Sequence, residues 1–475
     1  MEFPTKALKA RIKGQHSDPS RIKSLPLFDR NLEEALDGRR ALCNLHQQVL
    51  NDWQTGNEID FASNDILSWN SSGTLRLEFL SILAQHPDFQ PGSGGSRVLD
   101  GDSNFLETVE DYVARFHGAE DGLIVNSGYD ANLAVWSAIP RPGDVIVYDE
   151  LVHASSREGI TQSIASLQAE FRHSDTQSFR NTLISIIHSN QLIKCGKRSV
   201  LVAVESVYSM DGDICPLQDF VDIADDVFCE YGNIQFVIDE AHSTGLFGPK
   251  GAGLVCELGL EHRIAVRIQT YGKAMGASGA IILGSKTVKA ALLNFARSTT
   301  FTTAPSFPFV AAIKAGYNLQ DSSKGEEVRE RIQALARLYF ETLTSHPTWH
   351  LALSRGLLSV PLAKNWENRL FLTHIITMWT RPKHLYWLYF HLLSAGFCVW
   401  PIEYPAVPPG QGRIKVSLHA GNTETQVKSF INAVFQWVDQ IIAIDDGKSN
   451  KNVTEAAGLV YSWMKSEGLK GFGIV

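Results

Sequence analysis

Short runs of consecutive apolar residues recur between residues 120 and 285, and they constrain the fold more than any other feature of the chain. They occupy residues 123–125, 145–148, 200–204, 236–238 and 280–283. A strand whose residues are all apolar is buried on both faces, as in parallel sheets that helices cover on both sides. Helical stretches separate the runs, so we expect an α/β fold with a large, mostly parallel sheet.

Polar side chains follow these runs, at the points where the strands are expected to end. Ligands bind beyond the carboxyl ends of the strands in sheets of this kind. The segments concerned are Asn126-Ser127-Gly128-Tyr129, residues 149–153, Glu205-Ser206, Asp239-Glu240-Ala241-His242 and Gly284-Ser285. Downstream of the Asp239 segment, Thr270-Tyr271-Gly272-Lys273 places a lysine beside a glycine, where its side chain has room to be occupied covalently. We expect these segments to form one site.

The bulk composition narrows the class of protein. The 475 residues carry a formal net charge of -8, which offers no electrostatic footprint for nucleic acid or an anionic membrane. The six cysteines lack metal-ligand spacing, so no metal site is expected. The first residues lack the apolar segment of a secretory signal, and the apolar stretch 387–400 is shorter than the ~18 residues of a membrane span. We therefore expect a cytoplasmic protein without a transmembrane segment.

The pattern along the chain predicts its division. Residues 1–60 are a polar tail followed by a docking helix, for which the periodicity indicates a span from Leu32 to Trp53 with Leu36, Leu42, Leu45 and Leu50 on one stripe. Residues 61–310 form the large domain and residues 311–445 a smaller C-terminal α+β domain, which an amphipathic helix over residues 326–345 joins. Residues 446–475 are a C-terminal extension.

The sequence does not carry the complete motifs of a helicase, a dinucleotide-binding protein or a serine hydrolase. Asp239-Glu240-Ala241-His242 spells a helicase box, but no phosphate loop precedes it. The glycine cluster at residues 92–97 ends in Arg97 where a dinucleotide fingerprint needs glycine. No G-x-S-x-G nucleophile turn is present either.

A binding site for pyridoxal phosphate would account for the polar residues at all of these strand ends. That cofactor needs a lysine for covalent attachment, an acid that keeps the ring nitrogen protonated, and small residues around the phosphate. Lys273, Asp239 and Asn126-Ser127-Gly128 fill these needs, and the acid and the lysine are far enough apart for a helix and one further strand.

From residue 63 to Arg413 the chain resembles the α-oxoamine synthase branch of the fold-type I pyridoxal phosphate enzymes, with 8-amino-7-oxononanoate synthases the nearest pattern. The motifs that carry the resemblance follow in order along the chain: Gly92-Ser93-Gly94-Gly95-Ser96, Asn126-Ser127-Gly128-Tyr129, His153-Ala154-Ser155, Ser209-Met210-Asp211-Gly212, Asp239-Glu240-Ala241-His242, Thr270-Tyr271-Gly272-Lys273 and Tyr404-Pro405-Ala406-Val407-Pro408. It implies a fold-type I transferase with a large sheet domain and a smaller C-terminal domain.

The resemblance assigns catalytic roles around the cofactor. Lys273 would hold the cofactor and later move the substrate α-proton. Asp239 would pair with the ring nitrogen, and His153 would stack on the ring. Ser209 and His242 would lie near the phenolic oxygen.

The resemblance also assigns binding roles. Gly128, Tyr129 and Thr270 would hold the phosphate, and Thr303 would reach it from a neighbouring subunit, which implies a homodimer. Asn64 and Arg413 would bind the amino-acid carboxylate, for which a guanidinium's fixed fork is suited.

The implied reaction is a decarboxylative condensation of an amino acid with an acyl thioester, either acyl-CoA or carrier-bound, to an α-aminoketone. The sequence departs from the family at Leu106, where a histidine is usual. After Leu36-Asp37-Gly38-Arg39-Arg40 it continues as His46-Gln47-Gln48, where 8-amino-7-oxononanoate synthases continue basic. This puts recognition of a carboxylate-ended acyl chain in doubt.

Three alternatives stay open. The first is a secondary-metabolite or serine palmitoyltransferase-like enzyme that takes a fatty or polyketide acyl chain. The second, from another class, is a non-catalytic scaffold subunit, which the presence of Lys273 disfavours. The third is an aminotransferase or lyase on the same fold.

Overall fold

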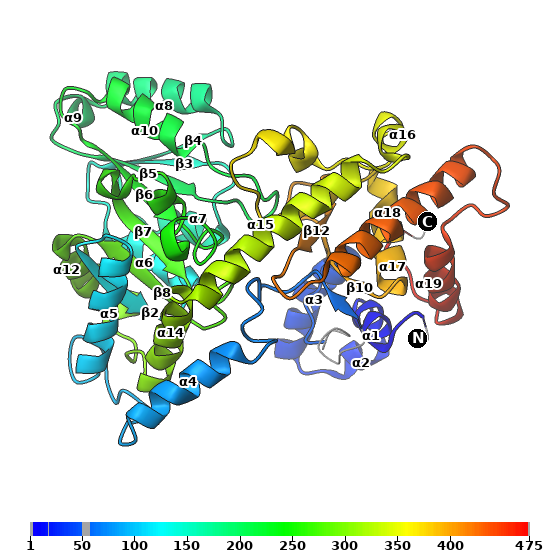
Figure 1. Cartoon of the computed structure of the whole chain (residues 1–475), viewed down its shortest axis with the longest axis horizontal. Helices are drawn as coiled ribbons and strands as arrows, with labels where there is room; N and C mark the ends of the chain where they lie inside the picture. The colour runs from blue at the N-terminus through cyan, green and yellow to red at the C-terminus, as the bar shows by residue number, and fades with distance from the viewer. Residues whose placement is uncertain (1–2, 18, 50–57, 474–475) are drawn as a thin grey trace. The chain divides into compact units, whose positions relative to one another are not determined.

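The computed structural model describes residues 3–17, 19–49 and 58–473 of the chain (Figure 1). It contains two compact units, which we call the sheet unit, Asn64–Ile332, and the terminal unit, Met1–Ser63 with Gln333–Val475. The division falls inside helix α15 (Ser323–Thr344), the amphipathic helix that the periodicity predicts. The domain boundary expected between residues 310 and 311 stays a prediction.

A seven-stranded sheet forms the centre of the sheet unit, in the order β2-β8-β7-β6-β5-β3-β4. Its strands are β2 (Asp121–Val125), β3 (Val145–Asp149), β4 (Leu167–Phe171), β5 (Val200–Glu205), β6 (Ile234–Asp239), β7 (Ile264–Thr270) and β8 (Ala280–Gly284). Strand β8 runs antiparallel to both of its neighbours, and the other pairs are parallel. The predicted α/β fold with a mostly parallel sheet is confirmed.

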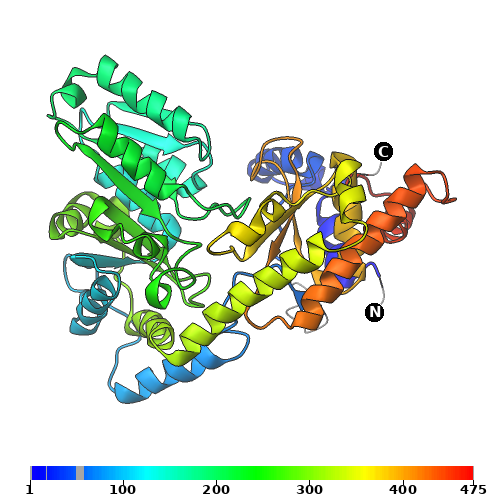
Figure 2. The ribbon, with the colours of Figure 1, turned by 45° about the horizontal axis from the view of Figure 1, so that its top comes forward.

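Alternate residues of the central strands belong to two separate hydrophobic cores, one on each face of the sheet. Val145 and Val147 pack with helices α8 (Thr176–Ser189) and α10 (Leu217–Val227), which lie along one face (Figures 1 and 2). Ile146, between them, packs with α6 (Gly128–Ala138) on the other face. Burial on both faces explains why these strands are continuous apolar runs.

Two strands of the sheet were not predicted, and each has a physical reason. Strand β4 lies at the edge of the sheet, and its exposed residues include Gln168 and Glu170. Strand β7 is buried but contains Arg267 and Gln269. Arg267 donates to the His117 carbonyl at 2.8 Å, so a polar residue is satisfied inside the core and breaks the apolar pattern.

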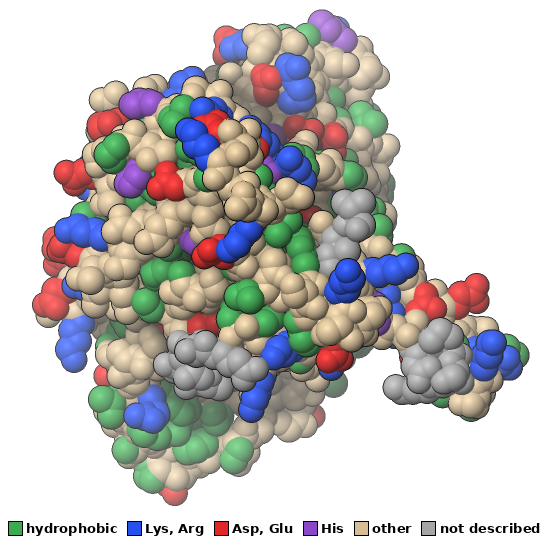
Figure 3. Space-filling view, turned by 90° about the vertical axis from the view of Figure 1, so that its right-hand side faces the viewer, with side chains coloured by type: hydrophobic (Ala, Val, Ile, Leu, Met, Phe, Trp, Pro, Cys, Tyr) green, Lys and Arg blue, Asp and Glu red, His purple; other side chains and the backbone are tan. Residues whose placement is uncertain are grey.

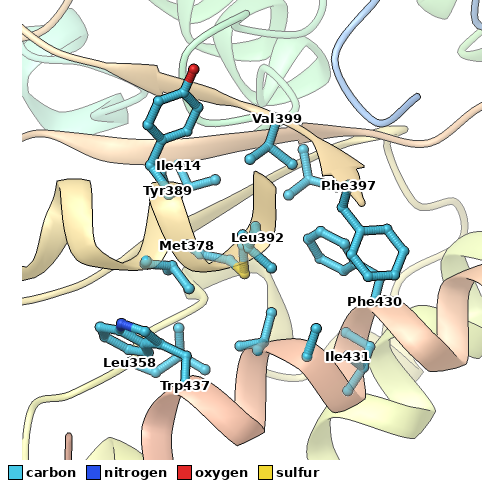
Figure 4. Packing of buried hydrophobic residues seen from close by; sticks show 14 of the residues in the cluster. Leu358, Met378, Tyr389, Leu392, Phe397, Val399, Ile414, Phe430, Ile431 and Trp437 are labelled. Atoms are coloured by element: carbon cyan, nitrogen blue, oxygen red, sulfur yellow. The ribbon is translucent and has the colours of Figure 1, made fainter. Parts of the chain in front are cut away.

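The terminal unit is the smaller α+β body. Strands β9 (Ile375–Trp379), β11 (Trp400–Ile402) and β12 (Arg413–Ser417) form an antiparallel sheet, and β1 (Ile59–Asp60) pairs in parallel with β10 (Phe397–Cys398). Figure 4 shows its core, in which Phe430, Ile431 and Trp437 of α18 (Glu424–Asp445) lie on the side of α17 (Leu385–Ser394) that carries Leu392, while Tyr389 points away from α18.

The N-terminal helix ends earlier than the periodicity predicts. Helix α3 covers Leu27–Ala41, and residues 42–49 are not helical. The prediction of a helix from Leu32 to Trp53 is therefore wrong for residues 42–49. Leu50 and Trp53 lie outside the described residues. Leu36 and Leu42 are exposed, whereas Arg40, one turn after Leu36, is mostly covered and pairs with Glu33 at 2.7 Å. The predicted docking of the leucine stripe stays a prediction.

None of the helices in the described part of the chain is both long and apolar enough to cross a lipid bilayer. The apolar stretch at residues 387–400 instead divides between α17, β10 and the start of β11. Figure 3 shows acidic and basic side chains mixed over one face of the molecule.

Candidate active site

A pocket of about 360 Å³ lies in the sheet unit where the carboxyl ends of the parallel strands meet. Strands β2, β3, β5, β6 and β7 end at this edge, and the antiparallel β8 begins there after Ser278-Gly279. The structure brings most of the predicted site residues to the pocket lining: Asn64, Gly128, Tyr129, His153, Ser209, Asp239, His242, Thr270 and Lys273.

Two predicted residues are placed elsewhere. Arg413 begins β12 of the terminal unit. Thr303 is exposed and pairs with Ser96 of the glycine cluster, next to Ala304, whose amide donates to the Gly95 carbonyl at 2.8 Å. The glycine cluster therefore holds the Thr303 segment in place.

Asp239, at the end of β6, is held by two hydrogen bonds. Its Oδ1 accepts from the Ala241 amide at 2.9 Å, and its Oδ2 accepts from Asn132 Nδ2 at 2.7 Å. Ser156 Oγ donates to the Asn132 oxygen at 3.0 Å, which fixes the orientation of that amide group. Asn132 was not predicted from the sequence; it is a buried polar residue among the apolar residues of helix α6.

Lys273 lies in a tight turn between β7 and β8. The Gly276 amide donates to the Lys273 carbonyl at 2.9 Å, and the Ala277 amide donates to the Tyr271 carbonyl at 2.9 Å. Burial lowers the pKa of the Lys273 ammonium, while the carboxylates of Asp239 and Glu205 oppose that shift. A lysine with a lowered pKa is a better nucleophile, because more of it is the neutral amine.

Gly128 and Thr270 form a cradle at the N-terminus of α6. Ser127 caps this helix by accepting from the Asp130 amide at 3.0 Å. A Cβ atom on Gly128 would lie only 2.5 Å from Thr270 Cγ2, so the backbone approaches Thr270 as closely as glycine allows. Thr270 Oγ1 is buried and has no hydrogen-bond partner among the residues that the structure describes. A helix N-terminus and an unsatisfied hydroxyl suit a phosphate group.

His153 caps α7 (Ala154–Thr161) beside the pocket. Its Nδ1 accepts from the Ser155 amide at 3.2 Å and lies 2.7 Å from Ser155 Oγ. Removal of water from around the ring lowers the pKa of His153, with Lys273 acting in the same direction and Asp239 against it. The ring is therefore expected to be neutral at pH 7.

Glu205, at the end of β5, is a pocket residue to which the sequence argument gave no role. It is buried, and its Oε1 accepts from the His153 amide. Burial raises the pKa of Glu205 well above its ordinary value, and the nearby Asp239 adds to this. The pocket thus contains one carboxyl group, that of Glu205, with a strong tendency to stay protonated.

Residues 57–434 match the family described as aminotransferase class I and II. The chain is 47% identical over 455 residues to the aminoacyl transferase sphA of Aspergillus fumigatus, an alignment that covers 96% of this chain and 97% of that one. It is 40% identical to an 8-amino-7-oxononanoate synthase of Emericella nidulans, with 86% and 96% covered.

The fold is similar to that of a solved serine palmitoyltransferase of Sphingomonas wittichii, with a TM-score of 0.66 at 24% identity over 80% of this chain and 87% of that one. The full-length similarity to the two fungal proteins agrees with the order of motifs along the sequence. The chain belongs to the aminotransferase class I and II family and, within it, to the α-oxoamine synthases.

Proposed function

We propose that this chain is a pyridoxal phosphate-dependent acyltransferase that joins an amino acid to an acyl thioester with loss of carbon dioxide. The pocket carries the proposal, because it combines a lysine of lowered pKa, an oriented carboxylate and a phosphate cradle at one sheet edge. When bound, pyridoxal phosphate supplies an aldehyde that takes up an amine and a ring that stabilises negative charge at the adjacent carbon.

The pocket residues fit that cofactor. Thr270 Oγ1 lacks a partner among the described residues and lies beside the backbone of Gly128 and Tyr129, where these groups would hold the phosphate. Asp239 would hold a proton on the ring nitrogen, and its bond from Asn132 keeps the carboxylate aimed into the pocket. The ring of His153, which lines the pocket, would cover one face of the cofactor ring.

Lys273 would also move the α-proton of the amino acid, since its lowered pKa leaves part of the amine neutral. His242 and Ser209, which line the pocket, would lie near the phenolic oxygen of the cofactor. We assign the substrate carboxylate to Asn64 and Arg413, and a phosphate contact across a homodimer to Thr303; the family resemblance supports these roles.

We propose an acyl donor that ends in an apolar chain instead of a carboxylate. Residues 46–48 read His-Gln-Gln, so they offer no permanent cation for a terminal carboxylate. The chain is also more similar to the aminoacyl transferase sphA than to the 8-amino-7-oxononanoate synthase, at 47% against 40% identity, which disfavours the activity of the latter. The donor is acyl-CoA or a carrier-bound thioester, and the terminal-carboxylate donor is the competing candidate.

Chemical trapping tests the lysine assignment. Borohydride reduction of protein incubated with pyridoxal phosphate should leave a pyridoxyl group on the peptide that contains Lys273, as mass spectrometry detects. The variant Lys273→Ala should carry no label there, while the matched control Lys286→Ala, which removes an exposed lysine from the same unit, should be labelled as wild type. Labelling of other lysines at the expense of Lys273 would contradict the assignment.

A release assay tests the reaction. Amino acids labelled in the carboxyl carbon, with glycine, alanine and serine as a first panel, should release labelled carbon dioxide only when an acyl thioester is present. Palmitoyl-CoA should support faster release than a CoA thioester with a terminal carboxylate. Release that does not depend on the thioester would indicate a decarboxylase or lyase. No release from unreduced, cofactor-loaded protein, whose reduced sample carries the label on Lys273, would favour the scaffold subunit.

A further inference from the structure

We propose that His173 is a positioning residue that clamps two pocket-lining segments together without touching the pocket itself. It lies just after β4, and its ring bridges two carboxylates. Nδ1 donates to Asp149 Oδ1 at 2.9 Å, and Nε2 donates to Asp213 Oδ2 at 2.8 Å. We call this group the His173 clamp. The inference rests on the function proposed above, because its purpose is to place pocket groups.

Both ring nitrogens of His173 face carboxylate oxygens, which requires the doubly protonated, charged form of the ring. Burial lowers the pKa of His173, but the hydrogen bonds and charges of Asp149 and Asp213 outweigh that effect and raise it to about 10. The ring also meets Tyr208 edge-on at 4.4 Å between centroids. Asp149 is fully buried, so its pairing with a charged histidine is not open to solvent.

Asp149 connects the clamp to the His153 turn. It ends β3, and its Oδ1 accepts from the Leu151 amide at 2.8 Å. Its main-chain carbonyl accepts from the Val152 amide at 3.1 Å. His153 follows directly and lines the pocket, so the position of its ring depends on this turn.

Asp213 connects the clamp to Ser209. Residues 206–215 form a narrow loop, in which Val207 pairs with Ile214 and the Tyr208 amide donates to the Asp213 carbonyl at 3.0 Å. The Gly212 amide closes the turn on the Tyr208 carbonyl at 2.8 Å. Ser209 lies at the tip of the loop and lines the pocket.

The clamp therefore joins residues that are distant in sequence but neighbours at the pocket. Its ion pairs hold the base of the Ser209 loop against the turn that carries His153. A cofactor-binding hydroxyl on a loop is only as well placed as the contacts that fix the loop, and small displacements reduce binding and rate strongly.

The first test needs no cofactor. In the protein without pyridoxal phosphate, Asp213→Ala should speed amide hydrogen exchange of residues 206–215 at least tenfold, and Asp213→Asn, which keeps an acceptor oxygen, should give a smaller change. The control Asp225→Ala removes the carboxylate of a more exposed pair with Arg263 in the same unit and should leave this loop unchanged. Unchanged exchange in Asp213→Ala would overturn the clamp even if the chain proves to be the proposed enzyme.

A double-mutant cycle tests the purpose of the clamp. Asp213→Ala and Ser209→Ala should each raise the dissociation constant for pyridoxal phosphate about tenfold. The double variant should have no higher a dissociation constant than the single variant that binds more weakly, because both changes remove the Ser209 hydroxyl from its place. A hundredfold, additive loss would show that Asp213 acts independently of Ser209 and would overturn the positioning role. Wild-type protein that binds no pyridoxal phosphate would overturn the proposed function, while the exchange result would still decide the clamp.

Discussion

Replacing Gly128 by alanine tests whether the approach of α6 to Thr270 forms the phosphate cradle. The new Cβ would lie 2.5 Å from Thr270 Cγ2 and 3.3 Å from Thr270 Cβ, so the threonine side chain must move. Overpacking of this kind costs about 1–3 kcal/mol, and alanine in a helix returns about 0.5–1 kcal/mol relative to glycine. The free energy of unfolding should therefore fall by roughly 0–2.5 kcal/mol.

Gly128→Ala should weaken the binding of pyridoxal phosphate more than it lowers the free energy of unfolding. Moving Thr270 takes its hydroxyl away from the phosphate, and a hydrogen bond to a charged group contributes about 1.5–3 kcal/mol, or roughly 10- to 100-fold in the dissociation constant. A titration of the apoprotein with pyridoxal phosphate, followed by absorbance, measures this loss. Thermal unfolding of the apoprotein measures the separate effect on the fold.

A second substitution provides the decisive comparison. Thr270→Ser removes Cγ2, the atom that the new Cβ would meet, and keeps the hydroxyl. The double variant Gly128→Ala with Thr270→Ser should recover most of the lost affinity. Gly38→Ala is the control, since its Cβ would have no neighbour within 4 Å and it lies outside the pocket, and it should bind normally. If the double variant binds pyridoxal phosphate as weakly as Gly128→Ala alone, the clash with Thr270 Cγ2 is not the cause of the lost affinity.

Three further predictions concern charged groups. Glu205→Gln should bind pyridoxal phosphate within about threefold of wild type, because burial keeps the pKa of this carboxyl high and glutamine also accepts from the His153 amide, whereas Glu205→Ala should lose about tenfold in the same titration. The folded-state pKa of His173 lies above its ordinary value, so the stability that its charged form contributes is complete below pH 6.5 and is lost as pH rises through about 10. The free energy of unfolding in urea should decline across this pH range in wild type, and His173→Asn should lack this part of the decline. Glu110→Gln should lower the free energy of unfolding by about 3–5 kcal/mol, because buried Glu110 accepts two hydrogen bonds from Arg97; an unchanged urea midpoint would contradict this.

Most of the sheet could be predicted, because β2, β3, β5, β6 and β8 each contain a run of consecutive apolar residues that packs into the core. The two strands that were not predicted, β7 and β4, interrupt this pattern with polar residues. Gln269 of β7 is fully buried and accepts from Thr244 Oγ1 at 2.6 Å, a partner that only the folded chain supplies. Strand β4 is half exposed at the sheet edge, where an apolar run is not required.

The pocket was predictable where a residue follows directly after a strand. Asp239 was found in this way, together with the glycine at the start of α6, whereas Lys273 was found from its place beside Gly272, because the strand before it was not predicted. Asn132 was not, because a helix interior gives no sign of which strand end it faces. The clamp residue His173 was also missed, since its partners come from the end of β3 and from the Ser209 loop, which only folding brings to it.

The parallel pairing of β1 with β10 sets an order of events during synthesis. Ile59 leaves the ribosome long before Phe397, its partner, has been made. The sheet unit lies between them in the chain, and all its strands have been translated once Gly284 has been added. Because domains generally fold as units while the chain emerges, the pocket is an early product of translation, and the body that joins the two ends of the chain closes last.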